Sequence, residues 1–438
     1  MEAIRIGLLG LGTVGGGVLR ILNRNNLEIT RRVGCSIRVV QACAREFDAE
    51  TVGYLEGISI TEQPINIVRN PDIDIVVELF GGMEPARSLL MEAILSGKHV
   101  VTANKALIAH HGNEIFEVAR VNNAIVAFEA AVGGGIPIIK ALREGLGANH
   151  IEWVAGIING TGNFILTEMR DKGRPFSEVL MDAQRLGYAE ADPSFDVEGI
   201  DAAHKLAILA AIAFGKPLRF DKVYTEGITD ITPEDVEYAE QLGYRIKHLG
   251  IAKRTVMGIE LRVHPTLIPE RRLIANVNSV MNAVLVKGDA VGPTLYYGAG
   301  AGSEPTASAV IADLIDVSRA LTTFPENRTP YLAFQPNAVR DIPILPMSEV
   351  TTAYYLRMRA NDRPGVLGEV ANIFGNRGIS IEAVVQKEPL PGISDVPLIM
   401  LSHRVLEGQM MEALAEIEKL DGINGNVTRI RVEQLSGE

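Results

Sequence analysis

The chain has 438 residues, enough for two or three domains of ordinary size. It carries 42 Lys and Arg against 54 Asp and Glu, a formal net charge of −12, which argues against binding to nucleic acid or to an anionic membrane. Its longest apolar stretch, residues 206–214, is far shorter than the roughly 18–20 residues of a membrane-spanning helix. Cys35 and Cys43 supply neither a disulfide framework nor a metal-ligand spacing, and the first residues lack a secretory leader, so the cytoplasm is the expected compartment.

Strands and helices alternate in the first third of the chain, the pattern of a doubly wound parallel α/β sheet. Helical patterns occupy residues 85–95 and 113–121. Short apolar runs rich in Val and Ile predict strands at residues 4–9, 37–42, 73–79, 99–102 and 124–128. We expect these elements to form a Rossmann-type domain over residues 1–131.

The middle of the chain predicts an α+β substrate and dimerisation domain over residues 132–340. It opens with consecutive glycines at residues 133–135 and contains a long apolar helix at residues 200–214. We expect a helix at residues 303–325 to pack back on the Rossmann domain. Antiparallel strands are predicted where apolar and polar residues alternate, at residues 255–263 and 279–287.

The last part of the chain predicts a separate small α+β domain over residues 351–438. A segment with two prolines precedes it and reads as a linker at residues 341–350. The pattern is β-α-β-β-α-β, as in ferredoxin-like folds. Its strands are expected at residues 353–359, 379–387, 396–402 and 427–432, and its helices at residues 366–377 and 409–420.

A glycine-rich turn follows the first predicted strand and opens a helix. It has the GxGxxG spacing of a dinucleotide site, where the glycines permit a tight turn and the helix N-terminus offers free N–H groups to a pyrophosphate. A glycine turn without a ligand is the alternative. The candidate cofactor residues are Gly10, Leu11, Gly12, Thr13, Val14 and Gly15.

The end of the second predicted strand bears on the choice of cofactor. An NAD-selective site usually has an acidic residue there, whereas a nearby arginine suits the 2′-phosphate of NADP. Arg45 is present, Glu46 follows it, and no acid ends the strand itself. We therefore expect NADP(H) to be accepted or preferred, with NAD(H) still open. A solvated Arg45 on a loop is the alternative.

Two lysines occupy positions suited to catalysis. Lys105 follows a predicted parallel strand, and ligands of such sheets bind beyond the carboxyl ends of the strands, although a loop lysine in water would give the same pattern. Lys205 lies near the start of an apolar helix, four residues after Asp201, so the two share a helical face. Because that helix reads as buried, we expect both charges to point into a cavity rather than form an exposed salt bridge.

An acidic loop precedes that helix and contains Glu190, Asp192 and Asp196. Such a cluster could hold the ammonium group of an amino acid, or could be a solvated loop that caps the helix. With a nicotinamide cofactor, these residues favour interconversion of an alcohol and a carbonyl, in which an ammonium lysine donates the proton.

Histidines are weaker candidates for this role. His110 and His111 read as a polar helix start, and His204 is expected to turn away from the face that carries Asp201 and Lys205. A zinc site built from these residues is not expected.

Several segments together resemble homoserine dehydrogenase, in its monofunctional form with a C-terminal ACT domain. The likeness covers nearly the whole chain, and residues 187–205 are its most specific part. It implies reversible, NAD(P)-dependent conversion of L-homoserine to L-aspartate 4-semialdehyde, which serves threonine, isoleucine and methionine synthesis. The segments are GLGTVGGGV, TANKALIA, AAVGGGIPII, NGTGNFIL, LGYAEADPSFDVEGIDAAHKLAILA and YGAGAGSEPTASAV.

The resemblance also implies roles for individual residues. Lys205 would be the favoured proton donor and Lys105 the second catalytic lysine, which would also lie against the cofactor. Substrate would be bound by Gly187, Glu190, Asp196 and Asp201, and the cofactor would further be contacted by Gly187 and Gly302. A structural monovalent cation, typically sodium, would be held by Glu129 and the carbonyls of Val132, Gly134 and Ile136.

In the C-terminal domain, the segment after the first strand looks like the loop of an ACT domain that binds a small amino acid. The resemblance implies feedback control by L-threonine and assembly into a homodimer or homotetramer; an ACT domain that only dimerises is the alternative. The candidate regulatory residues are Asn361, Asp362, Gly365 and Leu367.

Two other functions compete with this one. Aspartate-semialdehyde dehydrogenase chemistry needs a cysteine nucleophile, but Cys35 and Cys43 lie at the second predicted strand, near the adenosine end of the cofactor. A non-catalytic amino-acid sensor would keep its ligand affinity when Lys205 is replaced, whereas an enzyme would lose most of its rate.

Overall fold

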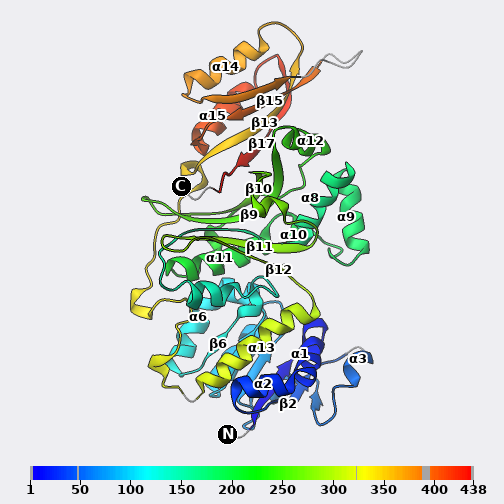
Figure 1. Ribbon diagram of the computed structural model, residues 1–438, viewed down its shortest axis with the longest axis vertical. Helices are drawn as coiled ribbons and strands as arrows, with labels where there is room; N and C mark the ends of the chain where they lie inside the picture. Colours follow the sequence, from blue (N-terminus) through cyan, green and yellow to red (C-terminus); the bar gives the residue numbers. More distant parts are fainter. Residues whose placement is uncertain (1–2, 47–48, 322, 387–394, 436–438) are drawn as a thin grey trace. The chain divides into compact units, whose positions relative to one another are not determined.

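The computed structural model describes residues 3–46, 49–321, 323–386 and 395–435 (Figure 1). These form two compact units. The first comprises Met1–Gly160, Asp201–Val223 and Val280–Ile342, and the second comprises Thr161–Ile200, Tyr224–Ser279 and Pro343–Glu438. Among the described residues, no helix combines the length and apolarity needed to cross a membrane.

The first unit contains a parallel sheet in the order β3-β2-β1-β4-β5-β6. The strand order reverses between β1 and β4, and such a switch point creates a ligand crevice beyond the carboxyl ends of the strands. A short strand, β3 (Ser59–Thr61), was not predicted, because its exposed residues carry no apolar pattern. The predicted strands are β1 (Ile4–Leu9), β2 (Ile37–Cys43), β4 (Ile75–Glu78), β5 (His99–Thr102) and β6 (Val126–Ala127).

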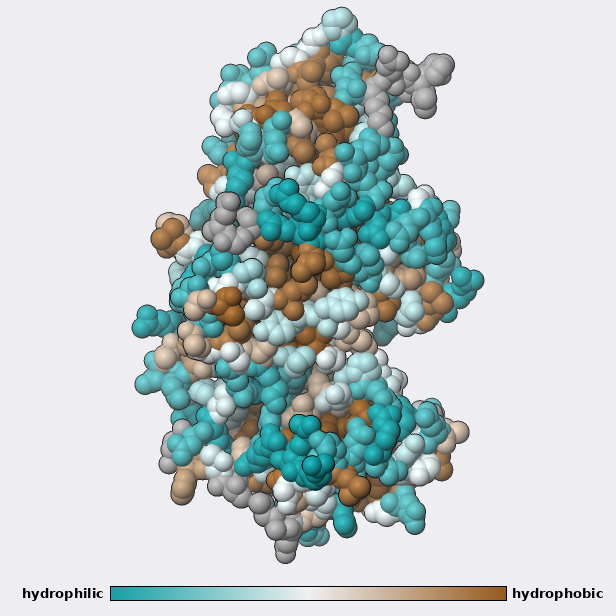
Figure 2. Space-filling view, viewed as in Figure 1, coloured by the Kyte–Doolittle hydropathy of each residue, from teal (hydrophilic) through white to brown (hydrophobic). Residues whose placement is uncertain are grey.

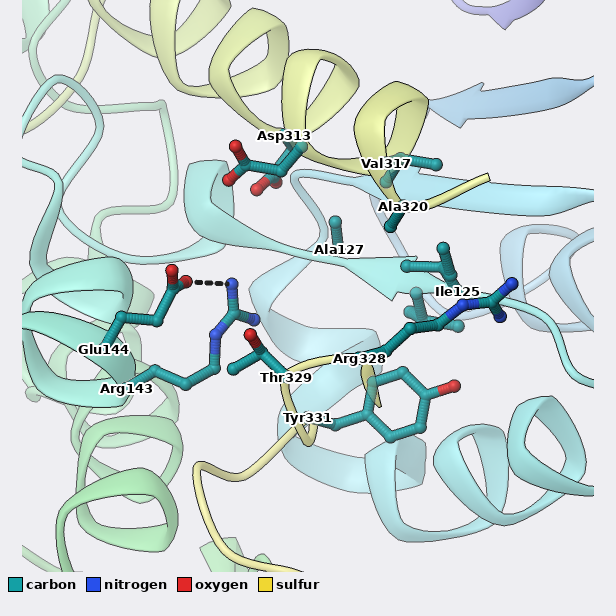
Figure 3. Close-up of a pocket in the computed structure, with 12 residues that line it drawn as sticks. Ile125, Ala127, Arg143, Glu144, Asp313, Val317, Ala320, Arg328, Thr329 and Tyr331 are labelled. Atoms are coloured by element: carbon teal, nitrogen blue, oxygen red, sulfur yellow. Dashed lines mark hydrogen bonds and ion pairs between the residues drawn. The ribbon is translucent and has the colours of Figure 1, made fainter. Parts of the chain in front are cut away.

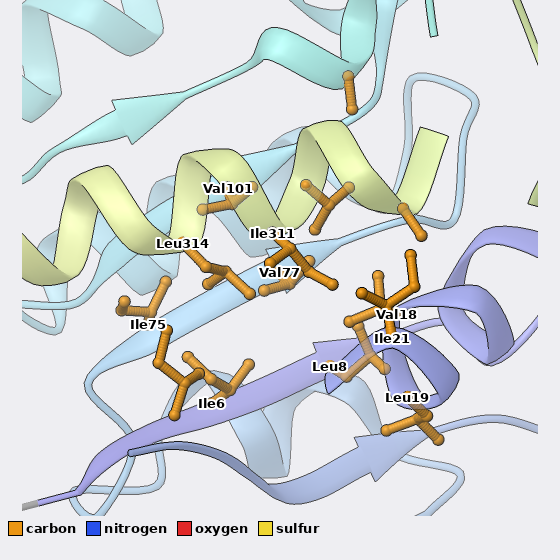
Figure 4. Packing of buried hydrophobic residues seen from close by; sticks show 14 of the residues in the cluster. Ile6, Leu8, Val18, Leu19, Ile21, Ile75, Val77, Val101, Ile311 and Leu314 are labelled. Carbon is orange, nitrogen blue, oxygen red and sulfur yellow. The ribbon is translucent and has the colours of Figure 1, made fainter. Parts of the chain in front are cut away.

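Two helices from distant parts of the chain share one face of this sheet (Figure 4). In this core, Leu8 of β1 and Val77 of β4 pack with Val18 of α1 (Thr13–Arg24) and Leu314 of α13 (Ser303–Ala320). Helix α13 ends at Ala320, before the predicted end at residue 325. The remaining helices of this part are α2 (Asn26–Val33), α3 (Ala49–Val52), α4 (Pro64–Val68), α5 (Ala86–Leu95) and α6 (Lys105–Val121).

The rest of the first unit carries an antiparallel sheet of three strands in the order β12-β11-β7. The apolar helix α11 (Ile200–Phe214) has the predicted bounds, and β11 starts two residues after the predicted position 279. The strands are β7 (Ile151–Ile157), β11 (Met281–Gly288) and β12 (Gly292–Ala299), and the short helices are η1 (Glu129–Ala131), α7 (Ile138–Lys140), the π-helical η2 (Ala141–Gly145), η3 (Phe220–Lys222), η5 (Pro325–Asn327) and η6 (Pro336–Ala338).

The second unit contains a long antiparallel hairpin, β9 (Tyr244–Arg254) and β10 (Ile259–Pro269). The strand predicted at residues 255–263 is wrong in its first half, because the Thr255 N–H donates to the Gly258 carbonyl at 2.8 Å and closes a turn there. Its other elements are α8 (Gly160–Lys172), α9 (Phe176–Arg185), α10 (Ser194–Val197), β8 (Tyr224–Thr225), α12 (Pro233–Gln241), η4 (Leu273–Asn276) and η7 (Met347–Glu349).

The C-terminal part of this unit has the predicted β-α-β-β-α-β order, with sheet order β17-β13-β15-β14. Lys387, the predicted end of one strand, lies outside the described residues. Strand β17 also pairs in parallel with β10, so one sheet continues from β9 and β10 into these strands. The elements are β13 (Thr351–Asn361), α14 (Val366–Asn376), β14 (Ile381–Gln386), β15 (Asp395–Ser402), β16 (Val405–Leu406), α15 (Glu407–Ile417) and β17 (Ile423–Val432).

The predicted linker is partly fixed by backbone contacts. Ile344 forms a parallel bridge with Ile259 at the start of β10, and the Leu345 N–H donates to the Ile259 carbonyl at 2.9 Å. The segment before β13 therefore lies along the sheet of the second unit instead of forming a free tether.

Candidate active site

The turn between β1 and α1 shows why each glycine of the GxGxxG motif is needed. Gly10 has φ of +108°, a conformation that favours glycine. A Cβ on Gly15 would lie 2.1 Å from the Gly10 carbonyl oxygen, so only glycine lets the helix start this close to the strand. At Gly12, in contrast, a Cβ would meet no protein atom within 4 Å. The turn therefore leaves open space in front of the α1 N-terminus, which fits the pyrophosphate of a dinucleotide.

The N-termini of two helices meet beside this turn. Ser303, the first residue of α13, donates through Oγ to the Thr13 carbonyl at 2.6 Å and accepts from Arg20 at 2.6 Å. Gly302 precedes it with φ of +124°, and a Cβ on Gly17 would lie 2.8 Å from Ser303. Gly302, predicted to contact the cofactor, thus lies at the α13 start that is bonded to the α1 start.

Arg45 follows the second strand of the sheet and is exposed. Cys43, the last residue of β2, accepts through its carbonyl from the Gly10 N–H at 3.0 Å, which ties the end of β2 to the glycine turn. Because β1 and β2 are parallel, Arg45 lies at the same edge of the sheet as the glycine turn.

Lys105, Asp201 and Lys205 form an ion cluster in the first unit, in which Asp201 and Lys205 are buried and Lys105 is half-buried. Lys105 Nζ lies 2.6 Å from Asp201 Oδ1, and Lys205 Nζ lies 2.6 Å from Asp201 Oδ2. The Asp201 residue is only 2% exposed. Lys105 begins α6 directly after β5, at the same carboxyl edge of the parallel sheet as the glycine turn. Asp201 and Lys205 are thus both buried and paired with each other, and Lys105 joins them.

The two neighbouring ammonium groups determine the protonation state of Asp201. Burial alone would raise the pKa of Asp201, but the ammonium groups of Lys205 and Lys105 hold the pKa of that carboxyl well below its usual range. The carboxylate is therefore charged at neutral pH and keeps two ammonium groups close to each other.

Two further groups complete the polar shell and were not singled out from the sequence. Asn159 Nδ2 donates to Asp201 Oδ2 at 2.9 Å, and Lys205 Nζ donates to the Ile158 carbonyl at 2.7 Å. Both belong to the segment that joins β7 to α8. The motif NGTG that begins at Asn159 was the available signal, but nothing in its spacing indicates which residue it would contact.

Glu78 is a second buried carboxylate at this edge of the sheet. It ends β4 and is fully buried. Its Oε2 accepts from Thr102 Oγ1 at 2.6 Å, and its Oε1 accepts from the N–H groups of Phe80 and Gly81 at 2.9 and 3.2 Å. Burial raises the pKa of Glu78, although these hydrogen bonds act to lower it. Its hydrogen bonds hold the loop that follows β4, which borders the crevice.

The histidines differ from what the sequence predicted. Helix α6 begins at Lys105, well before the predicted residue 113, so His110 and His111 lie inside it; the Asn104 side chain caps the helix by accepting from the Leu107 N–H at 3.0 Å. His204 does not turn away from Asp201: it meets His110 of α6, with 3.2 Å between the two Nε2 atoms. The helical period explains this, because residues three apart on α11 share a face.

The candidate substrate residues Gly187, Glu190 and Asp196 belong to the second unit. Gly187 follows the C-terminal end of α9 with φ of +75°, and Glu190 is exposed on the loop before α10. Asp196 is half-buried in α10. The loop is held by Gln184, whose Nε2 donates to the carbonyls of Glu190 and Ala191 at 3.1 and 3.2 Å.

Glu129, the candidate cation ligand, is almost fully buried in η1. Its carboxylate oxygens accept from the N–H groups of Ile139 and Lys140 at 2.9 and 2.8 Å. Burial nevertheless raises the pKa of Glu129 to about 7. A cation beside it would favour the charged form, and one carboxylate with the carbonyls of Val132, Gly134 and Ile136 is an all-oxygen set that suits a hard monovalent ion. Over the described ranges, no group of three or more His, Cys, Asp or Glu side chains forms a metal cluster.

A small cavity of about 110 Å³ lies next to this segment (Figure 3). Asp313 of α13 lines it and accepts from the Glu129 N–H at 2.8 Å, while burial and the nearby Glu129 raise the pKa of Asp313. Figure 3 also shows Arg143 joined to Glu144, at 3.0 Å, on another side of the cavity. None of the three residues of the lysine–aspartate cluster lines this cavity.

The candidate regulatory residues lie on the loop between β13 and α14. Asn361 ends β13; its N–H donates to the Gly422 carbonyl at 2.8 Å and its side chain donates to the Asp421 carbonyl at 3.1 Å. Gly365 has φ of +100° at the helix start, and Asp362 and Leu367 are exposed. The loop thus presents exposed groups and a helix N-terminus.

A glycine-lined helix start at the carboxyl edge of a parallel sheet is typical of a nicotinamide-dependent dehydrogenase, and here a lysine–aspartate–lysine cluster lies at the same edge. Residues 10–129 match the family described as homoserine dehydrogenase, NAD binding domain; residues 137–315 match homoserine dehydrogenase, and residues 354–422 match the ACT domain.

Comparisons with individual proteins also find homoserine dehydrogenases. A homoserine dehydrogenase from Pseudomonas aeruginosa is 62% identical over 436 residues, which cover 100% of both chains. The crystal structure of a homoserine dehydrogenase from Thiobacillus denitrificans has 64% identity and a TM-score of 0.94, and covers 99% of each chain. A hyperthermophilic archaeal homoserine dehydrogenase in complex with NADPH has 26% identity and a TM-score of 0.61, over 73% of this chain and 98% of that one.

The chain belongs to the homoserine dehydrogenase family. It is an NAD(P)-dependent oxidoreductase of amino-acid biosynthesis with a C-terminal ACT domain.

Proposed function

We propose that Lys105, Asp201 and Lys205 carry the interconversion of L-homoserine and L-aspartate 4-semialdehyde, with Lys205 as the proton donor. The observation that carries this assignment is the buried cluster in which one carboxylate holds both ammonium groups at 2.6 Å, at the carboxyl edge of the sheet with the glycine turn.

The cofactor that we propose is NADP(H), with NAD(H) as the alternative. Gly10, Leu11, Gly12, Thr13, Val14 and Gly15 would hold its pyrophosphate, because the space before the α1 N-terminus is open at Gly12. Exposed Arg45 would bind the 2′-phosphate, and Gly302 would border the ring that reacts. NADPH in the archaeal relative supports this preference. When bound, the cofactor supplies or accepts the hydride.

The lysines act on the oxygen of the substrate. In the reducing direction, the Lys205 ammonium donates a proton to the carbonyl oxygen as that oxygen gains negative charge, and Lys105 stabilises the same charge. In the oxidising direction Lys205 must be neutral to accept the hydroxyl proton, so this direction should accelerate as the pH rises. Asp201 holds the two ammonium groups together in a site where their mutual repulsion would otherwise separate them.

Glu190, Asp196 and Gly187 are the proposed contacts for the amino-acid end of the substrate. Glu190 carries an exposed carboxylate suited to an α-ammonium group, and Asp196 follows it in the short helix α10. A monovalent cation, proposed as sodium, would be bound by Glu129 and the carbonyls of Val132, Gly134 and Ile136, where it would fix the segment between β6 and α7.

The ACT domain is proposed to bind L-threonine through Asn361, Asp362, Gly365 and Leu367 and to inhibit turnover. Assembly into a homodimer or homotetramer in the cytoplasm is proposed with it. The edge strands β12 and β14 support assembly, since Tyr297 and Val384 on them are 58% and 41% exposed. Figure 2 also shows apolar side chains gathered over the C-terminal strands β13 and β15.

The test is the consumption of NADPH with L-aspartate 4-semialdehyde, with and without L-threonine, and repeated with NADH. Turnover that threonine suppresses supports both the site and the regulatory role. Turnover that is indifferent to threonine keeps the catalytic proposal and leaves the ACT domain to assembly. The cofactor preference follows from the ratio of kcat/KM with NADPH to that with NADH, and Arg45→Ala should lower this ratio if Arg45 binds the 2′-phosphate.

A further inference from the structure

His110 and His204 join the two helices that carry the catalytic cluster. Helix α6 begins with Lys105 and contains His110, and helix α11 contains Asp201, His204 and Lys205. The Nε2 atoms of the two imidazoles lie 3.2 Å apart, and the rings meet edge to face with centroids 5.1 Å apart. The two helices are therefore connected at two places, by the Lys105–Asp201 ion pair and by the histidine pair.

The two histidines of this pair differ in their exposure to solvent. His204 is 4% exposed, whereas His110 reaches solvent. The ring of Phe220 in η3 packs on both, with centroid distances of 4.2 Å to His204 and 4.6 Å to His110. The aromatic ring restricts the orientation of both imidazoles, so the hydrogen bond between them has a defined geometry.

This hydrogen bond requires one proton on the two facing nitrogens. A neutral imidazole has one donor and one acceptor nitrogen, whereas both nitrogens of a protonated imidazole are donors. A second proton on the pair would place two donors against each other and a positive charge near Lys105 and Lys205.

Burial first, and then His110, lower the pKa of His204 to about 4, and burial also lowers the pKa of His110. The charged groups that act on His204 are Asp201 and Lys205 on its own helix and Lys105 on α6, while His111 acts on His110 and η3 contributes the apolar Phe220 ring.

We propose that His110 and His204 are positioning residues whose single-proton hydrogen bond sets the spacing of α6 and α11 and thereby holds Lys105 and Asp201 in register for catalysis. Neither histidine needs to touch the substrate. A displacement of about 1 Å between catalytic groups can cost about 100-fold in rate, so a change in helix spacing is enough to affect turnover. The inference rests on the proposed roles of Lys105 and Asp201.

The experiment compares His204→Leu, His204→Gln, His110→Gln and His110→Leu by steady-state kinetics across pH. The Gln amide nitrogen takes the place of Nε2 and can still donate, while Leu cannot. We expect His204→Leu to lower kcat about 10- to 100-fold with the KM for NADPH unchanged, and His204→Gln to recover most of the loss. In His110→Gln, which lacks the solvent-facing ring that takes the second proton, the acid limb of the kcat profile should move to lower pH.

His111→Gln is the matched control, because His111 is adjacent to His110 on α6 and is not the ring that meets His204; it should keep the wild-type kcat and pH profile. Should His204→Leu fail to fold, His110→Leu removes the same hydrogen bond from the solvent side and should show the same loss of kcat. Wild-type kcat and pH profile in the Leu variants, or a Gln variant as slow as the Leu variant, would overturn the proposal. Wild-type kcat in Lys105→Ala would instead contradict the proposed catalytic site.

Discussion

Asp201 is the residue on which the electrostatics of the lysine–aspartate cluster depend. A carboxylate this buried costs several kcal/mol to desolvate unless charged partners surround it, and here two ammonium groups and the Asn159 amide do so. The lysines in turn are close enough to repel each other without it. One carboxylate therefore serves two cations, and removal of that carboxylate leaves two ammonium groups uncompensated in the site.

Replacement of Lys205 tests its role as proton donor. We expect Lys205→Ala to lower kcat by about 10²- to 10⁴-fold, the usual contribution of a general acid, because no other ammonium takes its position on α11. Stopped-flow or steady-state oxidation of NADPH measures the change. Lys222→Ala in η3 is the control, since Lys222 is exposed and should leave kcat unchanged. An active Lys205→Ala variant would transfer the donor role to Lys105.

The charge of Asp201 also predicts how stability depends on pH. Its native pKa is lowered below the unfolded value of about 3.9, so the ionised group stabilises the fold above that pH, and the contribution is lost as the pH falls through the native pKa. We expect Asp201→Asn to lower the free energy of unfolding at pH 7 by about 3–5 kcal/mol, because it leaves buried ammonium groups unbalanced. The difference from wild type should shrink below about pH 4.

Urea denaturation of both proteins at pH 7 and at about pH 3 measures this difference. Asp221→Asn serves as the control, because the Asp221 side chain is 64% exposed and its weak pair with Lys222 should contribute little at either pH. A gap between Asp201→Asn and wild type that stays constant with pH would contradict the electrostatic explanation.

At the residue scale, the sequence indicated part of the site. Asp201 and Lys205 stand out because they are charges in an apolar helix, and Lys105 because it follows a parallel strand. The contact between His110 and His204 joins residues 94 positions apart, and it could not be predicted because it depends on how two helices pack. Asn159 was missed for the same reason.

Among the elements, the turn between β1 and α1 contains glycines that are needed for two different reasons, the packing of the protein and the space for a ligand. Gly15 is needed by the protein itself, since a Cβ there would lie 2.1 Å from a backbone oxygen. Gly12 has φ of −71°, which any residue adopts, and faces open space, so its lack of a side chain serves the ligand.

Replacement of Gly12 and of Gly15 by alanine should therefore have different effects. Gly12→Ala should fold with an unchanged Tm but bind NADPH at least about 10-fold more weakly, because the methyl group occupies the space before the helix N-terminus. Gly15→Ala should lose both stability and cofactor binding. Thermal denaturation and fluorescence titration with NADPH measure the two properties separately. Equal loss of Tm in both variants would show that Gly12 is also needed for folding.

The elements that the sequence predicted best are those with one clear pattern. β1 and β5 have the predicted bounds because each is a short apolar run followed by a turn or a helix cap, and α11 because it is apolar all round. Helix α6 begins before the predicted residues 113–121 and runs through Gly112, where a Cβ would lie 2.4 Å from Leu218, so the glycine allows close packing inside the helix. The strands β9 and β12 were not predicted, although their neighbours β10 and β11 were in part.

At the scale of the whole molecule, the second unit joins the ACT domain to the rest of its sheet. Strand β17 pairs with β10, and buried ion pairs accompany this pairing. Arg431 of β17 is fully buried and bonds Glu407 of the ACT helix α15 at 2.5 Å and Glu226 at 2.9 Å. Arg262 of β10 similarly bonds Glu433 at 2.6 Å. The domain is therefore anchored by buried and partly buried ion pairs, which salt screens much less than surface pairs.

Glu226 also connects this anchor to the proposed substrate loop within the same unit. The adjacent Gly227 is so close to α10 that a Cβ would lie 2.6 Å from Glu198 and 2.8 Å from the Val197 carbonyl. The Ile228 N–H donates to that carbonyl at 3.0 Å. Since Asp196 precedes Val197, a displacement of Arg431 can be transmitted through Glu226 to Asp196, a candidate substrate residue.

Glu226→Gln should weaken the proposed inhibition by L-threonine more than it weakens turnover. The variant keeps the size of the side chain but removes the charge that pairs with Arg431, and the coupling between two sites is typically worth about 1–3 kcal/mol, or about 5- to 150-fold in affinity. We therefore expect the threonine concentration for half-inhibition to rise by at least about 5-fold while kcat stays within about 3-fold of wild type. Glu412→Gln on the exposed face of α15 is the control and should leave inhibition unchanged. Unchanged inhibition in Glu226→Gln would exclude this route, whereas equal loss of kcat and inhibition would mean that Glu226 supports the substrate loop itself.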